Sequence, residues 1–214
     1  MLAALLLAST AGPPPEAAGP SFAIVASCIC PPPPSVAAAS CECPDGATLG
    51  EAFAAQELAH MLGNISNGSQ PLLILNATAT LPAATRRIAV GYSASVALGV
   101  RAADLDHLGL EGSRLSVPGP HNTLPPGCLA VSGGQGAVRG ALYGVYELLG
   151  LLGLEFMAWD HTVFPPGSPH ADLPSLLARL PAADLVTQPS FMYRDLGEWP
   201  VYSNRLHSRR MRLS

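Results

Sequence analysis

Short runs of apolar residues alternate with turn-forming and polar residues along this chain. Each run is a few residues long and is bounded by glycine, proline, asparagine or serine, a pattern typical of strands. We therefore expect strands at residues 21–27, 71–76, 86–92, 113–117, 128–133 and 154–159. Beyond residue 160 prolines interrupt the pattern, and we predict no regular element there.

Helical spacing of apolar residues follows three of these runs. Thr48 and Glu51 form the T-x-x-E pattern of a capping box, which predicts a helix start, and Gly63 is the expected helix end. A short helix is predicted over 93–106, and another from a Gly-rich turn to about Leu152. The apolar face of the first helix consists of Ala54, Leu58, Met61 and Leu62.

The order of these elements predicts the fold class. Two pairs of consecutive strands have no helix between them, and the connection at 118–127 is rich in Pro, Gly and Asn, as in a long hairpin loop. A doubly wound parallel sheet would need a helix between most strands. We therefore predict an α+β fold, a two-layer sandwich whose mixed, mostly antiparallel sheet carries helices on one face.

Length and charge narrow the functional classes. The 214 residues suffice for one sizeable domain, which we place at 21–188, after a leader at 1–20. A Pro- and Cys-rich insertion at 28–46 has four consecutive prolines and should be extended.

The net charge of −4 argues against a nucleic-acid surface. No apolar run reaches the roughly 18 residues that cross a bilayer, so we expect no membrane span.

Two features indicate the secretory pathway. The leader has a short apolar core followed by small residues, as in a signal peptide, although an arbitrary Ala-rich leader would look similar. Asn64, Asn67 and Asn76 each begin an N-x-S/T sequon and are candidate glycosylation sites. We therefore expect the chain to be secreted or to lie in the lumen of the secretory pathway.

The cysteines are consistent with that compartment. Cys28 and Cys30 precede the Pro-rich stretch, and Cys41 and Cys43 follow it. Adjacent C-x-C cysteines rarely bridge each other, so we favour two disulfides between the pairs; free thiols and a zinc site remain alternatives. Cys128 begins an apolar strand and is expected to be buried.

The Gly-rich turn has two interpretations. Gly134, Gly136 and Gly140 lie between a strand and a helix, and Glu155 follows about twenty residues on, which resembles a dinucleotide site. However, Gly136, Gly140 and Gly144 recur every four residues and would lie on one side of the helix, where they let its backbone approach the sheet. We favour close packing, with Val138, Leu142, Val145, Leu149 and Leu152 as the apolar contacts.

The same segment carries a family resemblance. Residues 131–160, VSGGQGAVRGALYGVYELLGLLGLEFMAWD, resemble the small α/β domain that precedes the catalytic barrel in α-glucuronidases of family 67. The β-hexosaminidases of family 20 carry a similar domain. The further similar segments are 54–63, 88–93, 108–117 and the join at 180–195. The resemblance implies a non-catalytic N-terminal domain of a secreted glycoside hydrolase, packed against a barrel of which 189–214 would be the start or only a tail.

The resemblance also implies one substrate contact. Pro189, Phe191, Tyr193 and Arg194 match a P-x-F-x-[WY]-R segment whose Arg binds substrate hydroxyls in family 20. Asp195 stands where that family tends to have Gly, so a simple Arg194–Asp195 ion pair is the alternative. We expect no catalytic residue in this chain, because glycoside hydrolysis uses carboxylates of the barrel. We also expect no cofactor, and no metal, because the histidines are scattered without H-x-x-x-H spacing.

Three functions are compatible with these patterns. The leading one is the accessory domain, with a barrel and a carbohydrate as its partners, and whether the chain is itself an enzyme stays open. The alternatives are a Rossmann-like nucleotide-binding domain and a secreted module that binds glycans or proteins. An accessory domain without its barrel should expose an apolar patch.

Overall fold

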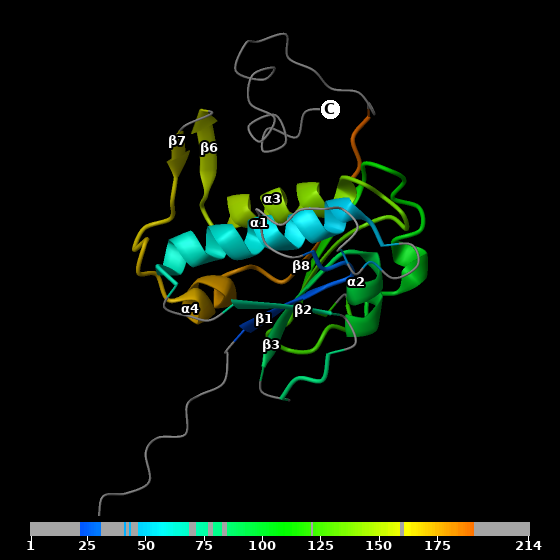
Figure 1. The fold of residues 1–214 in the computed structure, drawn as a ribbon, viewed down its shortest axis with the longest axis horizontal. Coiled ribbons are helices and arrows are strands. Elements are labelled where there is room, and N and C mark those ends of the chain that lie inside the picture. Colours follow the sequence, from blue (N-terminus) through cyan, green and yellow to red (C-terminus); the bar gives the residue numbers. More distant parts are fainter. Residues whose placement is uncertain are drawn as a thin grey trace, which may run out of the picture.

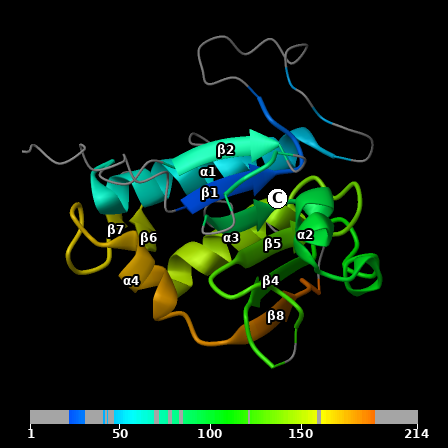
Figure 2. The ribbon, with the colours of Figure 1, turned by 90° about the horizontal axis from the view of Figure 1, so that it is seen from below.

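A computed structural model describes residues 22–30, 41, 43, 47–68, 72–76, 79–82, 85–120, 122–158 and 161–190. Its centre is a six-stranded sheet with the strand order β2-β1-β3-β5-β4-β8 (Figures 1 and 2). These strands are β1 (Phe22–Ala26), β2 (Leu72–Asn76), β3 (Arg86–Val90), β4 (Ser113–Val117), β5 (Leu129–Gly133) and β8 (Ala183–Thr187). A separate hairpin pairs β6 (Glu155–Ala158) with β7 (His161–Val163).

The sheet is mixed and the fold is α+β, as predicted, but the sheet is not mostly antiparallel. β1 pairs with β2 and β3 in parallel, β3 pairs with β5 in parallel, and only β4 is antiparallel to its neighbours β5 and β8. The prediction is wrong because β2 and β3, which have no helix between them, do not form a hairpin. Instead they flank β1, so the chain between Asn76 and Arg86 passes from one side of β1 to the other.

Helices cover both faces of the sheet, not one. The helices are α1 (Leu49–Ser66), α2 (Tyr92–Leu98), α3 (Gly140–Leu151) and α4 (Leu173–Ala178), with a 3₁₀ turn η2 (Ala102–Asp104). Neighbouring residues of a strand point to opposite faces. Ile24 and Ile88 therefore pack with α1 and α3, whereas Val25 and Ala89 pack with α2 and the residues after it. The predicted two-layer sandwich thus gains a partial third layer.

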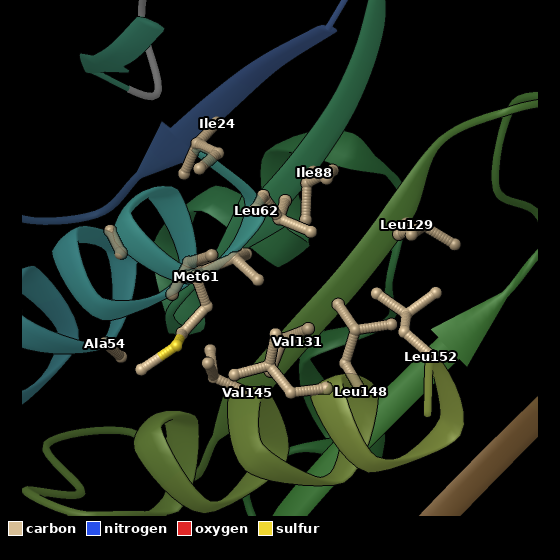
Figure 3. Packing of buried hydrophobic residues seen from close by; sticks show 14 of the residues in the cluster. Ile24, Ala54, Met61, Leu62, Ile88, Leu129, Val131, Val145, Leu148 and Leu152 are labelled. Atoms are coloured by element: carbon tan, nitrogen blue, oxygen red, sulfur yellow. The ribbon is translucent and has the colours of Figure 1, made fainter. Parts of the chain in front are cut away.

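The main core lies between the sheet and the pair α1 and α3. Figure 3 shows Met61 of α1 extending toward Val145 of α3, Leu62 of α1 beside Ile88 of β3, and Val131 of β5 over α3. All five side chains are 2% exposed or less. Burial of such aliphatic side chains is the dominant favourable term in folding, so this layer fixes how the two long helices lie on the strands.

Helix α1 begins where the sequence predicts and ends later. The Thr48 side chain accepts a hydrogen bond from the Glu51 N–H at 3.3 Å, and the Glu51 side chain accepts one from the Thr48 N–H at 3.0 Å. Gly63 does not end the helix. The buried Ile65 continues its apolar face, and the chain turns at Asn67, whose φ of 52° is left-handed.

The region after residue 160 contains more structure than the sequence predicts. Asp172 caps the start of helix α4, because its carboxylate accepts a hydrogen bond from the Ser175 N–H at 3.0 Å. Strand β8 then pairs with β4 as the outermost strand of the sheet. In the predicted helix at 93–106, Gly99 with a φ of 120° ends α2 early, and only η2 follows.

Candidate functional site

The carboxyl ends of the parallel strands β1, β3 and β5 meet at one edge of the sheet. In α/β proteins this edge is where ligands commonly bind. Strand β3 leads directly into α2 on one face, and β5 leads through the Gly-rich turn into α3 on the other. A nucleotide-binding interpretation places its site at this edge, so the contacts there decide between the two interpretations of the turn.

The glycines of the turn bring backbone against backbone. A Cβ atom at Gly140 would overlap the carbonyl oxygen of Gly112 and lie 2.7 Å from the Cα of Gly133. One turn further along α3, a Cβ atom at Gly144 would lie 2.7 Å from a methyl group of Val131. Real Cβ atoms essentially never approach other atoms this closely, so the close packing predicted for Gly140 and Gly144 is confirmed.

Two details of that prediction are wrong, because α3 begins only at Gly140. Gly136 lies in the turn before the helix, with a φ of 69° and no atom within 4 Å of an added Cβ. Val138 is 59% exposed and makes no core contact. The apolar positions of α3 that are buried as predicted are Leu142, Val145, Leu149 and Leu152.

The acidic residue of the nucleotide interpretation lies in the wrong place. In a dinucleotide fold it follows the neighbouring parallel strand, where it meets the ribose. Glu155 instead begins β6, which belongs to the separate hairpin and does not pair with the main sheet. In the described sheet, Glu155 is therefore not placed to bind the ribose of a nucleotide held by Gly134 and Gly136.

A buried carboxylate of the chain itself occupies the edge of the sheet. Glu51 is 2% exposed, and its carboxylate accepts the Tyr92 N–H at 2.7 Å as well as the Thr48 N–H at 3.0 Å. These N–H groups belong to the starts of α2 and α1, where unpaired donors and the helix dipole attract negative charge. Glu51 thus satisfies N–H groups at the starts of both helices with a side chain of the protein itself.

The remaining space at this edge is also filled. Ser27, at the end of β1, accepts the Ala94 N–H of α2 at 2.9 Å. Gly91 precedes α2 with a φ of 101°, and a Cβ there would lie 2.6 Å from the Ser27 hydroxyl and 2.8 Å from the Glu51 carboxylate. Only glycine fits at this position, so the chain has closed the crevice with its own polar groups.

Burial sets the charge state of Glu51. Removal from water raises the pKa of this carboxyl above its ordinary value of 4.5, and the hydrogen bonds from Tyr92 and Thr48 oppose that rise. A buried Glu51 carboxylate that accepts two N–H groups is suited to holding the starts of α1 and α2 together. Proton transfer to a substrate from solvent would need an exposed carboxyl group, whereas the Glu51 carboxyl group is buried.

A second polar cluster lies on the α2 face of the sheet. Arg114 on β4 forms a two-pronged ion pair with Asp184 on β8, and Ser116 donates a hydrogen bond to the same carboxylate at 2.8 Å. Arg114 also lies 3.5 Å from the carboxylate of Asp104, which Arg101 binds through two hydrogen bonds. No local sequence pattern marks this cluster, because Arg114 and Asp184 are 70 residues apart.

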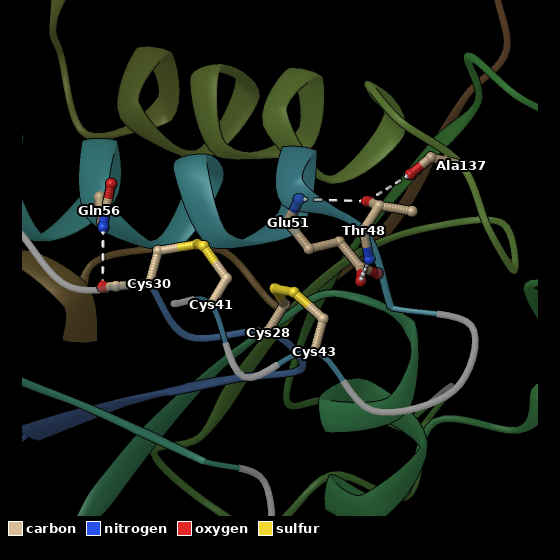
Figure 4. Close-up of a disulfide and its surroundings, with 8 residues drawn as sticks. All are labelled: Cys28, Cys30, Cys41, Cys43, Thr48, Glu51, Gln56 and Ala137. Atoms are coloured by element: carbon tan, nitrogen blue, oxygen red, sulfur yellow. Dashed lines mark hydrogen bonds between the residues drawn. A yellow bond between two sulfur atoms is a disulfide. The ribbon is translucent and has the colours of Figure 1, made fainter. Parts of the chain in front are cut away.

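The structure joins the four cysteines of the insertion across the two pairs, as predicted. Cys28 is bonded to Cys43 and Cys30 to Cys41 (Figure 4). The Gln56 side chain of α1 donates a hydrogen bond to the Cys30 carbonyl at 3.1 Å, so Cys30 is held against the helix. Cys128 is buried and free, as expected for an apolar contact.

We predict that the nested disulfide connectivity contributes measurably to stability. The double variant Cys30→Ser/Cys41→Ser, which opens a loop with a sequence separation of 11, should lower the free energy of unfolding by about 2–3 kcal/mol. Urea denaturation followed by circular dichroism measures this. Peptide mapping without reduction tests the pairing itself, and fragments linking Cys28 to Cys41 would refute it.

The three sequons differ in exposure. Asn64 and Asn67 are exposed near the end of α1, and the Asn64 side chain hydrogen-bonds His60 at 3.2 Å. Asn76 is partly buried at the end of β2. A glycan is bulky and needs open surface, which favours the turn at Asn67.

We therefore expect unequal glycan occupancy. When the chain is expressed through a secretory pathway, occupancy at Asn67 should exceed that at Asn76, as measured by mass spectrometry after enzymatic deglycosylation. The Asn67→Gln variant should lose the main glycan, and the Asn76→Gln variant should keep it. Higher occupancy at Asn76 would contradict the geometric argument.

The other predicted site features lie elsewhere or are not found. Phe191, Tyr193, Arg194 and Asp195 lie outside the described residues, so the substrate contact proposed for Arg194 has no geometry here. Across the described ranges, no three His, Cys, Asp or Glu side chains gather closely enough to hold a metal ion. In the same part of the chain, no helix is long and apolar enough to cross a bilayer.

Exposed apolar side chains surround the Gly-rich turn. Leu49, Leu110 and Val138, which we call the apolar rim, are 53%, 58% and 59% exposed. The Thr48 hydroxyl donates to the Ala137 carbonyl at 3.2 Å, which brings Leu49 beside Val138. An ion pair of 3.3 Å joins Arg139, which follows Val138, to Glu111, which follows Leu110.

Comparison of the sequence with known proteins does not identify a family. No protein-family model matches the chain, and no curated protein matches it either.

Proposed function

We propose that this chain is a non-catalytic accessory domain of a secreted glycoside hydrolase, and that its apolar rim docks against the catalytic domain. The observation that carries the proposal is where the chain leaves the sheet. Gln188, just after β8, donates a hydrogen bond to the His107 carbonyl at 3.3 Å, three residues from Leu110 of the rim. In Figure 1 the orange end of β8 lies at the same end of the molecule as the starts of α1 and α3.

The exit point and the apolar rim together favour docking of a domain that begins after β8. Residues 189–195 resemble the join between such a domain and its barrel. Residue 189 directly follows Gln188, which is bonded to His107, three residues before the exposed Leu110. Large apolar side chains that are more than half exposed and grouped on one end of a domain are typical of an interaction surface. A barrel that starts there would cover the rim without a long linker.

The disulfide bonds and the exposed sequons support secretion. Two disulfides close a small Pro-rich segment, and such bonds persist in oxidising compartments and not in the cytosol. The exposed sequons at Asn64 and Asn67 agree with the same compartment. The geometry counts against the nucleotide-binding alternative, because the backbone of Gly112 packs against Gly140 at the start of α3 and Glu155 lies on the separate hairpin.

The sequence of the transcript beyond codon 214 tests the enzyme part of the proposal. We expect an open frame that continues into a (β/α)₈ barrel with two carboxylates at the carboxyl ends of its strands. Transcripts that end at codon 214 in every isoform, with no barrel encoded downstream, would refute the assignment to a glycoside hydrolase.

The docking role predicts self-association of the 214-residue chain. At high concentration the chain should form reversible oligomers, as measured by light scattering coupled to size-exclusion chromatography. The double variant Leu49→Glu/Val138→Glu should elute as a monomer with an unchanged melting temperature, because both side chains are already mostly exposed.

A matched control is available on the hairpin. Met157 on β6 is 64% exposed but lies outside the rim, so Met157→Glu should leave the self-association unchanged. Equal loss of self-association in both variants, or a monomeric unmodified chain, would contradict docking through the rim.

A further inference from the structure

A pocket of about 300 Å³ opens on the α2 face of the sheet, away from the edge that Glu51 closes. Its walls are the residues that follow α2, the strand β4 and the connection between β4 and β5. This volume is at the lower end of the range for small-molecule sites, about 300–1,000 Å³. The pocket is therefore large enough for one small ring compound.

The polar side of the pocket is held rigidly. Arg114 is only 12% exposed and is fixed by its two-pronged ion pair with Asp184, whose carboxylate also accepts from Ser116. The other end of the Arg114 guanidinium donates to the backbone carbonyl of Asp104 at 3.3 Å. Side chains held by such bonds need little ordering when a ligand binds.

The charges of the ion-pair cluster in and beside the pocket cancel. Arg101 and Arg114 face Asp104 and Asp184, so the group as a whole is neutral. A bare anion would meet the carboxylate of Asp104, and a cation would meet the two guanidinium groups. Neither kind of ion finds the opposite charge unpaired, which argues against a phosphate, sulfate or metal ligand.

Donors and acceptors remain side by side in the pocket. The hydrogen bonds of Arg101 to Asp104 use its Nε and Nη2 atoms, and among the described residues its Nη1 group has no partner. The oxygens of Asp104 and of the Thr123 hydroxyl can accept further bonds. A hydroxyl group both donates and accepts, so a compound with several hydroxyls matches this alternation.

The pocket lining also includes apolar side chains. Val100 and Leu124 are 8% and 7% exposed and line the pocket together with Pro120. A lining with both apolar and polar side chains suits a ring that carries C–H groups on its faces and hydroxyls at its rim. Such ligand sites combine apolar area with a few placed polar groups.

We propose that this pocket binds a neutral, polyhydroxylated ring compound the size of a monosaccharide. The inference rests on the pocket and its charge balance and does not depend on the docking role of the rim. Arg101, Asp104 and Thr123 contact the hydroxyls, and Val100, Pro120 and Leu124 contact the ring.

Titration of the isotope-labelled 214-residue chain, followed by its amide NMR signals, tests the proposal. The probes are glucose, galactose, mannose, N-acetylglucosamine and myo-inositol, with inorganic phosphate and acetate for comparison. We expect at least one polyol to bind with a Kd of about 1 mM, as befits so small a ligand, and to shift the amides of Gly99, Thr123 and Leu124. Shifts from phosphate or acetate alone, or none at these amides, would overturn the proposal.

Paired variants assign the effect to the pocket. Asp104→Asn should weaken binding at least tenfold, whereas Asp106→Asn, the same change outside the pocket, should leave it unchanged. Arg101 is 78% exposed, so Arg101→Gln should fold even if Asp104→Asn does not. Its matched control is Arg139→Gln, which removes the ion pair with Glu111 and lies outside the pocket. Equal affinity in Arg101→Gln and Arg139→Gln would refute the assigned contacts.

Discussion

Replacing Gly140 with alanine should lower the free energy of unfolding by about 3 kcal/mol, because the new methyl group must displace backbone. The Cβ atom would overlap the Gly112 carbonyl oxygen and press on the Cα of Gly133 at 2.7 Å. Neither atom can rotate away as a flexible side chain would. Urea denaturation monitored by circular dichroism measures the loss.

The same helix supplies the control. Gly150 lies in α3 with no atom within 4 Å of an added Cβ. Alanine there should raise the free energy of unfolding by about 0.5–1 kcal/mol, the ordinary gain over glycine inside a helix. Gly144 should fall between the two, because its nearest neighbour is a side-chain methyl of Val131. If all three alanine variants were equally stable, close packing of the turn would be wrong.

Removing the Glu51 carboxylate should cost about 2–5 kcal/mol of unfolding free energy. The Glu51→Ala variant leaves the N–H groups of Thr48 and Tyr92 buried without their acceptor, and each unsatisfied donor costs about 1–3 kcal/mol. Glu51→Gln should retain one of the two bonds, because an amide offers one acceptor oxygen and an NH₂ group that repels the second donor. Its loss should be about half that of the alanine variant.

The pH dependence of Glu51→Gln gives a second readout. The pKa of Glu51 is raised in the folded state, so protonation favours folding. The stability that this group contributes is fully present below about pH 4.5 and is lost as pH rises through the folded-state pKa. The difference in unfolding free energy between the unmodified chain and Glu51→Gln should therefore shrink with rising pH. A difference that grows with pH would contradict the burial of the carboxylate, and Glu155→Gln on the exposed hairpin is the control.

The sequence predicted features that depend on neighbouring residues. Thr48 and Glu51 are three positions apart, so their capping box and the start of α1 could be read directly. The strands from β1 to β6 were found at nearly their observed bounds because each is a short apolar run between turn residues. The spacing of Gly140 and Gly144 correctly predicted that they allow close packing. The prediction that Val138 is an apolar contact of the same helix was wrong, because Val138 is exposed.

The sequence could not predict contacts between distant segments. The bond from Tyr92 to Glu51 joins residues 41 apart, and nothing near either of them marks it. Whether two strands pair or flank a third depends on the whole sheet, so the parallel arrangement around β1 was missed. Strand β8 was missed because the charged Asp184 interrupts its apolar residues, it follows a proline-broken stretch, and it is stabilised by its pairing with the distant β4.

A crystal structure of the 214-residue chain, determined from crystals soaked with pyrophosphate and separately with NAD, tests the central claim most directly. We expect the backbone of Gly140 to lie against Gly112 and Gly133, the Glu51 carboxylate to hold the Tyr92 N–H, and no diphosphate at the turn. A diphosphate bound by the backbone N–H groups of 134–140, with Glu51 displaced from Tyr92, would contradict the account.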